Sequence, residues 1–296
     1  MKLIRSRPTL AGADSAYRRS LYRGFLALLV GLSRVVVRQT RRCASAFPLA
    51  APRDRRKPMS RLSIRLGYWS AVLFAIVFIG YGVGVVSMIL FFPLPPWTTL
   101  ADFVAAVHPA SLVIYTLIQL AAFLSMPLAA ILFCTFHDYA PSDKKILTSI
   151  ALCAIIAAMV LGNQMYSVHF NAARQSISQG VLTGLEQFVE WNPNSVVMAS
   201  GTLGWTFFFG LACIFVAPIF SGGLLERGLR YASLICGSCG ILGWVGSLLG
   251  STVFGLVYLT GGTVSVITLA VLASILFKRL EARHVLRAPW PESDLS

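Results

Sequence analysis

The chain has 296 residues, of which 56% are hydrophobic and 12% are charged. A soluble domain carries roughly 25% charged residues, so this composition excludes an ordinary soluble protein and indicates a membrane protein. The net charge of +14 does not indicate a nucleic-acid partner, because residues 1–65 hold 16 Lys/Arg and 2 Asp, whereas residues 66–296 hold 9 Lys/Arg and 9 Asp/Glu. The basic excess therefore belongs to the N-terminal segment alone.

Residues 1–58 form a basic extension with several interpretations. Its Arg-rich, acid-poor composition fits a polybasic anchor on anionic lipid or a transit peptide. Arg18 and Arg19, followed by a short apolar run, resemble a twin-arginine signal, but Arg41 and Arg42 fit a cleavage region poorly. We expect instead that this extension is disordered or misassigned to the gene and that translation begins at Met59, directly before the first apolar segment.

The rest of the chain alternates between apolar runs and short polar loops. Tyr231–Phe277 is 47 residues long without a charged residue. A bilayer core needs about 20 helical residues, so this run predicts two crossings with a turn near Gly250 and Ser251. The pattern predicts a membrane domain over residues 59–279 and a polar tail over 280–296. Its six spans are expected at about 68–92, 110–134, 146–166, 197–220, 231–250 and 254–277.

Loop charge predicts the orientation of these spans. The loops after the second and fourth spans, with the C-terminal tail, hold eight basic residues: Lys144, Lys145, Arg227, Arg230, Lys278, Arg279, Arg283 and Arg287. The loops on the other side hold Arg174 alone. The positive-inside rule therefore predicts that both termini lie in the cytoplasm, and the layout is typical of a small bacterial inner-membrane protein.

The longest loop, between the third and fourth spans, carries apolar residues at helical spacing, among them Ile177, Val181, Leu185 and Val189. This periodicity predicts one amphipathic helix on the outer surface, covering the bundle. We expect it to be an interfacial connector.

Motifs for catalysis are sparse. No span contains a clearly internal charged residue, which argues against a proton pump or a carboxylate-coupled antiporter. Cys236 and Cys239 form a C-x-x-C pattern, but their position in an apolar helix favours packing over redox chemistry. His108 and His169 fall near the outer boundary, too shallow for a haem between two spans. We therefore expect no catalytic residue, no metal site and no cofactor.

Two pairs of glycines have the small-x-x-x-small spacing that permits close helix contact in membranes. They are Gly80 with Gly84 in the first span and Gly246 with Gly250 in the fifth. We predict that all four are helix-packing residues.

Uncharged polar and aromatic residues gather at similar depths in the outer halves of the spans. Tyr115 and Gln119 are four residues apart and share a helix face. If the faces converge, they form a small-molecule pocket; the alternative is that the amides bridge helices and the tryptophans only pack. The candidate ligand-binding residues are Tyr115, Gln119, Asn163, Gln164, Trp205, Trp244 and Tyr258.

The sequence thus predicts an all-α integral membrane protein, a six-span bundle with one amphipathic outer-surface helix. Three functions are open. The first is non-catalytic binding or carriage of a neutral or apolar small molecule. The second is a structural or regulatory subunit that docks onto another membrane protein. The third is a thiol-redox or haem-bearing membrane enzyme. The expected partners are the lipid bilayer and another membrane protein or a second copy, with no nucleic acid.

Overall fold

The computed structural model describes residues 59–286, which are mainly helical and contain no strand in that range. Six helical runs in this part are long and apolar enough to cross a membrane, which confirms the predicted number of candidate spans. The expectations for residues 1–58 and for 287–296 lie outside the described residues. The candidate spans are Arg61–Phe91, Pro109–Tyr139, Ser142–Ser178, Val196–Ile219, Leu224–Leu248 and Val253–His284.

The first, second and fifth spans are single helices, whereas the others are composite. The single helices are α2 (Arg61–Phe91), α4 (Pro109–Tyr139) and α9 (Leu224–Leu248). The third run comprises η1 (Ser142–Lys144), α5 (Lys145–Val168), η2 (His169–Ala173) and α6 (Arg174–Ser178). The fourth comprises α7 (Val196–Thr202), η3 (Leu203–Phe208), α8 (Phe209–Val216) and η4 (Ala217–Ile219). The sixth comprises α10 (Thr252–Val257), η5 (Tyr258–Gly262) and α11 (Thr263–Leu286). A short helix, α3 (Leu100–Ala106), joins the first two spans.

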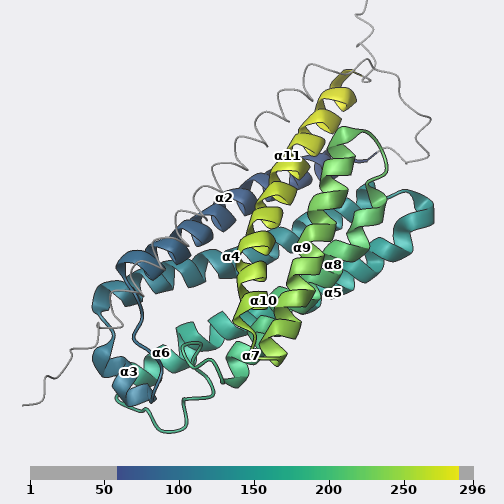
Figure 1. Cartoon of the computed structure of the whole chain (residues 1–296). Coiled ribbons are helices and arrows are strands. Elements are labelled where there is room, and N and C mark those ends of the chain that lie inside the picture. The colour runs from purple at the N-terminus through teal and green to yellow at the C-terminus, as the bar shows by residue number, and fades with distance from the viewer. Residues whose placement is uncertain (1–58, 287–296) are drawn as a thin grey trace, which may run out of the picture. The chain divides into compact units, whose positions relative to one another are not determined.

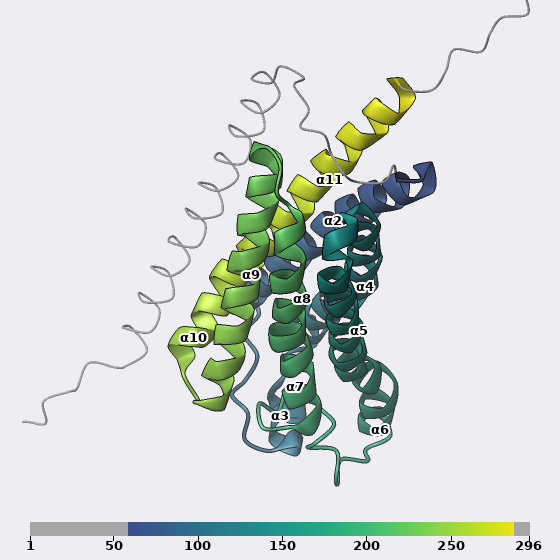
Figure 2. The same cartoon turned by 90° about the vertical axis from the view of Figure 1, so that its right-hand side faces the viewer.

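The six runs are arranged as a closed ring. Each packs against its neighbour in the chain, and α11 returns to pack against both α9 and α2 (Figures 1 and 2). Short connections force antiparallel neighbours, as in up-and-down helix bundles. The first and last runs therefore lie side by side, and Arg65 Nε lies 3.3 Å from Glu281 Oε1 across their contact.

The two ends of the ring differ in chemistry. One end, here called the basic end, holds Lys144, Lys145, Arg227, Arg230 and Lys278. The opposite end, here called the cap end, holds α3, α6, α7 and α10 together with the loop from Gln179 to Ser195 (Figure 2).

Large aromatic side chains fill the ring toward the basic end. Phe136 stacks on Phe277 with ring centroids 6.0 Å apart and meets the edge of Phe220 at 5.2 Å. All three side chains are fully buried. Aromatic rings bury large areas and interdigitate well, so this half of the ring is a packed core.

The predicted amphipathic helix in the long loop is wrong. Helix α6 ends at Ser178, and the chain then forms turns up to Ser195. Gly180 and Gly184 adopt φ values of +75° and +80°, which interrupt helical geometry. Three of the four apolar residues named for that helix are nevertheless buried or partly buried, since Ile177 and Leu185 pack against a cluster of Leu100, Ala173 and Val189, whereas Val181 is 53% exposed. The periodicity identified a buried face but not its backbone conformation.

The turn between the fifth and sixth spans lies where the sequence places it. Gly250 has φ +62°, and the Ser251 N–H donates to the Gly246 carbonyl at 2.8 Å. This pattern is a Schellman motif, in which a left-handed glycine ends a helix and satisfies its last carbonyls.

Candidate cap-end cavity

A cavity of about 450 Å³ lies inside the ring in its cap-end half. Five of the six candidate spans line it, with the second span absent from its wall. Where the basic-end half is filled by phenylalanines, this half has seven glycines on its wall: Gly201, Gly240, Gly243, Gly246, Gly250, Gly255 and Gly262. Glycine contributes no side-chain volume, so a ring of the same helices stays open here.

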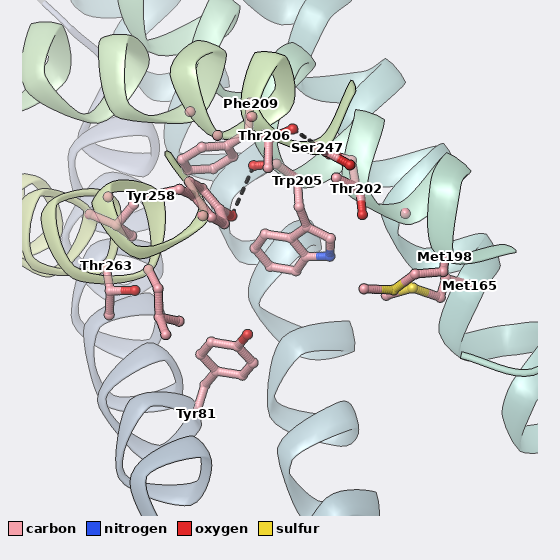
Figure 3. Close-up of a pocket in the computed structure, with 18 of the residues that line it drawn as sticks. Tyr81, Met165, Met198, Thr202, Trp205, Thr206, Phe209, Ser247, Tyr258 and Thr263 are labelled. Carbon is pink, nitrogen blue, oxygen red and sulfur yellow. Dashed lines mark hydrogen bonds between the residues drawn. The ribbon is translucent and has the colours of Figure 1, made fainter. Parts of the chain in front are cut away.

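Aromatic rings form much of the remaining wall. Phe78 lies 5.5 Å from Tyr81 and 6.3 Å from Trp205 between ring centroids. In Figure 3 the Trp205 indole occupies the middle of the group, with Tyr258 to one side and Met198 to the other. A mainly apolar wall with a few polar groups is typical of small-molecule sites.

Two π-helical segments contribute to this wall. Segment η3 supplies Trp205 and Thr206, and η5 supplies Tyr258 and Gly262. In η3 the Phe209 N–H donates to the carbonyls of Gly204 and Thr206 and not to that of Trp205, four residues earlier. The Trp205 carbonyl instead accepts a hydrogen bond of 3.2 Å from the Tyr258 hydroxyl (Figure 3). Isolated π-helical turns within α-helices are frequent at functional sites, and here they join two spans at the cavity.

A carboxylate enters the cavity wall from the long loop. Glu190 lines the cavity, and among residues 59–286 no other Asp, Glu, Lys or Arg does so. Its Oε2 accepts a hydrogen bond from Gln119 Nε2, and the Tyr115 hydroxyl lies close to this carboxyl. Burial raises the pKa of Glu190 from 4.5 to about 7, against the opposing effect of these two neighbours.

Several polar atoms in the cap-end half are buried without a hydrogen-bond partner. They include Gln119 Oε1, His169 Nδ1, Trp191 Nε1 and Trp205 Nε1, of which only Trp205 belongs to the cavity wall. His169 meets the Trp191 ring edge-on at 4.7 Å, and Tyr115 lies 6.3 Å from both rings. Buried polar groups are normally paired, so each of these atoms could pair with water or with a polar group of a ligand that enters here.

The candidate ligand-binding residues separate into three groups. Trp205 and Tyr258 line the cavity, and Tyr115 and Gln119 connect to it through Glu190. Trp205 Nε1 lies near the Tyr166 hydroxyl without forming a hydrogen bond of normal geometry.

The remaining three candidates lie elsewhere. Asn163 Nδ2 donates to the Phe123 carbonyl at 3.1 Å, which bridges α5 to α4. Gln164 is exposed, and Trp244 packs on Phe207 with ring centroids 4.9 Å apart. These three residues are absent from the cavity wall, because a shared depth along the spans does not fix which helix face a residue occupies.

Sequence reasoning missed Glu190, because this residue falls on the polar face of the expected amphipathic helix, outside the expected spans. The signal that could have found it is local: Glu190 stands between Val189 and Trp191, two large apolar residues that are buried or half-buried.

The positions of the cysteines and histidines do not support a thiol-redox or haem site. The Cys236 sulfur lies 3.6 Å from that of Cys213 on the neighbouring α8, so its partner is not Cys239. Exposed His108 caps the start of α4, whereas His169 is buried. Within the described range, no three His, Cys, Asp or Glu side chains lie close enough together to hold a metal ion.

The four helix-packing glycines behave differently from one another. A methyl group added at Gly84 would lie 2.5 Å from Ile118 Cγ1, and one at Gly246 would collide with Phe254 Cβ. At Gly80 and Gly250 it would meet no atom within 4 Å. Gly80 is therefore not at a helix contact, and Gly250 serves the turn through its positive φ.

Comparison with protein-family models, with curated proteins and with solved structures finds no match to this chain.

Proposed function

We propose that this chain is a multi-pass membrane protein that binds or carries a small, mainly apolar molecule in the cap-end cavity. The cavity carries the proposal, since its volume of about 450 Å³ falls in the range of small-molecule sites, roughly 300–1,000 Å³. Its glycine and aromatic lining would contact an apolar body, and its hydroxyls and Glu190 would orient one polar group.

Orientation follows from the two ends of the ring. Lys144, Arg227 and Lys278 gather at the basic end, so the positive-inside rule assigns that end to the cytoplasm of a bacterial inner membrane. The cavity then opens toward the outer side. Ser247 is exposed and also lines the cavity, which places it at the opening.

Thermal unfolding of the purified protein against a panel of small aromatic and aliphatic compounds tests the proposal. A ligand at about 100 times its Kd stabilises a protein by about 2.7 kcal/mol. We expect Ser247→Trp, which would fill the opening, to abolish that stabilisation. Leu248→Trp is the matched control, because Leu248 is 67% exposed and does not line the cavity.

Two outcomes contradict the proposal. One is that no compound stabilises the unsubstituted protein, which would favour the docking-subunit function instead. The other is that ligands stabilise Ser247→Trp as strongly as they stabilise Leu248→Trp, which would place binding outside this cavity.

A further inference from the structure

We propose that the ligand of the cap-end cavity is an organic cation, an apolar molecule that carries one protonated amine recognised by Glu190. This inference rests on the proposed function and narrows its ligand class from neutral or apolar molecules to cationic ones. It is carried by the charge, the aromatic lining and the unpaired acceptor described above.

The charge of the wall is one-sided. Glu190 is half-buried in the wall, and no Lys or Arg within residues 59–286 joins it there. Its polar neighbours, Gln119 and Tyr115, are uncharged groups that can donate hydrogen bonds. A carboxylate away from water is disfavoured unless a cation neutralises it, so a ligand ammonium would supply the missing charge.

The aromatic wall favours the same ligand. Tyr81, Tyr166, Trp205 and Tyr258 all line the cavity that Glu190 lines. The faces of such rings carry negative potential and attract ammonium groups, which is how aromatic cages select cations over neutral molecules of the same shape.

The amide that donates to Glu190 carries an unpaired acceptor, although Trp205 Nε1, from a residue of the cavity wall, is an unpaired donor. Gln119 is 1% exposed, and its Oε1 has no hydrogen-bond partner although its Nε2 is bound to Glu190. The Glu190 carboxylate on the cavity wall only accepts hydrogen bonds when it is ionised. An ammonium has up to three N–H donors and no acceptor, so it matches this carboxylate, whereas a hydroxyl matches it in part and a carbonyl does not.

A pair of isosteric probes tests the inference. In 4-phenylbutylamine a protonated amine occupies the position of the terminal methyl group in pentylbenzene, and this amine stays charged throughout pH 5–8. Binding of both compounds is measured by calorimetry on the full chain in lipid nanodiscs. The variants are Glu190→Gln and, as the matched control, Glu186→Gln, which removes an exposed carboxylate of the same loop.

We expect the amine to bind the unsubstituted protein and Glu186→Gln equally, and to bind Glu190→Gln at least about tenfold more weakly. Pentylbenzene binding should not change between the three proteins. The affinity for the amine should also rise several-fold from pH 5 to pH 8 as Glu190 ionises, and Glu190→Gln should lose that dependence. Tyr81, Tyr115 and Tyr166 face Glu190, but phenols ionise near pH 10 in water and stay protonated in this range.

Three results overturn the inference. The amine fails to bind the unsubstituted protein at millimolar concentration, it binds Glu190→Gln as tightly, or pentylbenzene loses affinity to the same extent as the amine. A different result tests the proposed function. Pentylbenzene binding that Ser247→Trp abolishes would retain the cavity as a binding site even if the amine shows no preference for Glu190.

Discussion

The Gln119 amide on α4 donates a hydrogen bond to the Glu190 carboxylate, 71 residues later in the chain. This contact joins a buried position in the second span to the loop after the third. It brings a titratable group to the wall of the cap-end cavity without placing charge within a span. The ring of six helices therefore has an acidic group on the wall of its cavity, although the middle parts of the six candidate spans carry no charged residue.

Glu190 makes stability depend on pH. Its pKa is raised to about 7 in the folded protein, from 4.5, so the folded state binds more protons than the unfolded state between these values. The contribution of Glu190 to the free energy of unfolding is therefore greatest below pH 4.5, and it is lost as the pH rises toward 7. For a half-buried carboxyl we expect a loss on the order of 2 kcal/mol, after allowing for screening by water.

Urea or thermal unfolding of the protein in detergent from pH 5 to pH 8 measures this loss. Glu190→Gln should flatten the profile, whereas Glu186→Gln should leave it unchanged. A profile for Glu190→Gln that parallels that of the unsubstituted protein would show that the carboxyl is not buried in this way.

Close contact between the fifth and sixth spans depends on Gly243. A methyl group at this position would lie 2.6 Å from Tyr258 Cβ, which is closer than real carbon contacts allow. We expect Gly243→Ala to destabilise the protein by about 1–3 kcal/mol through overpacking. Gly80→Ala is the control, because a methyl group there meets nothing within 4 Å and alanine favours the helix. Equal thermal stability of both variants would contradict the close contact.

The hydrogen bond from Tyr258 to the Trp205 carbonyl joins the two π-helical segments. Tyr258→Phe removes the donor and leaves a buried carbonyl without it, so we expect a loss of about 1–3 kcal/mol of stability. Tyr231→Phe, at a position 62% exposed, should change stability by less than about 0.5 kcal/mol. Thermal unfolding compares the two; an equal effect would show that the hydrogen bond does not stabilise the junction.

Labelling with a membrane-impermeant maleimide tests the orientation. Asn194 and Ser142 are both exposed, in the cap-end loop and in the loop at the basic end. We expect Asn194→Cys to react in intact cells and Ser142→Cys to react only after the membrane is opened, compared with the unsubstituted chain as background. The reverse pattern would place the basic end outside.

The sequence predicted features that depend on local chemistry. The 47 uncharged residues from Tyr231 to Phe277 predicted two candidate spans, and Gly250 marked the turn between them, where a residue with positive φ ends the helix. The backbone conformation of the long loop could not be predicted in the same way, since its spacing of apolar residues fits both a helix and a chain that folds through turns. Gly180 and Gly184, with positive φ, decided between them.

Only some of the candidate site residues could be predicted from the sequence. Trp205 and Tyr258 could be selected from residue type and depth, but Gln164 and Trp244 met the same criteria and lie elsewhere. Depth follows from position along a helix, whereas direction depends on how each helix is rotated in the ring. The π-helical segments change that rotation locally, and they have no signature in residue pattern.

By itself, the sequence determined that this chain has six candidate membrane spans, because apolar length and loop charge are properties of each segment alone. The tertiary structure decided that glycines and aromatic rings enclose a cavity, and that Glu190 reaches its wall. Those features depend on which distant segments meet. The small side chains at the cap end leave the ring open there. Burial of the loop after the third span places a carboxyl group, expected on the surface, in the cavity wall.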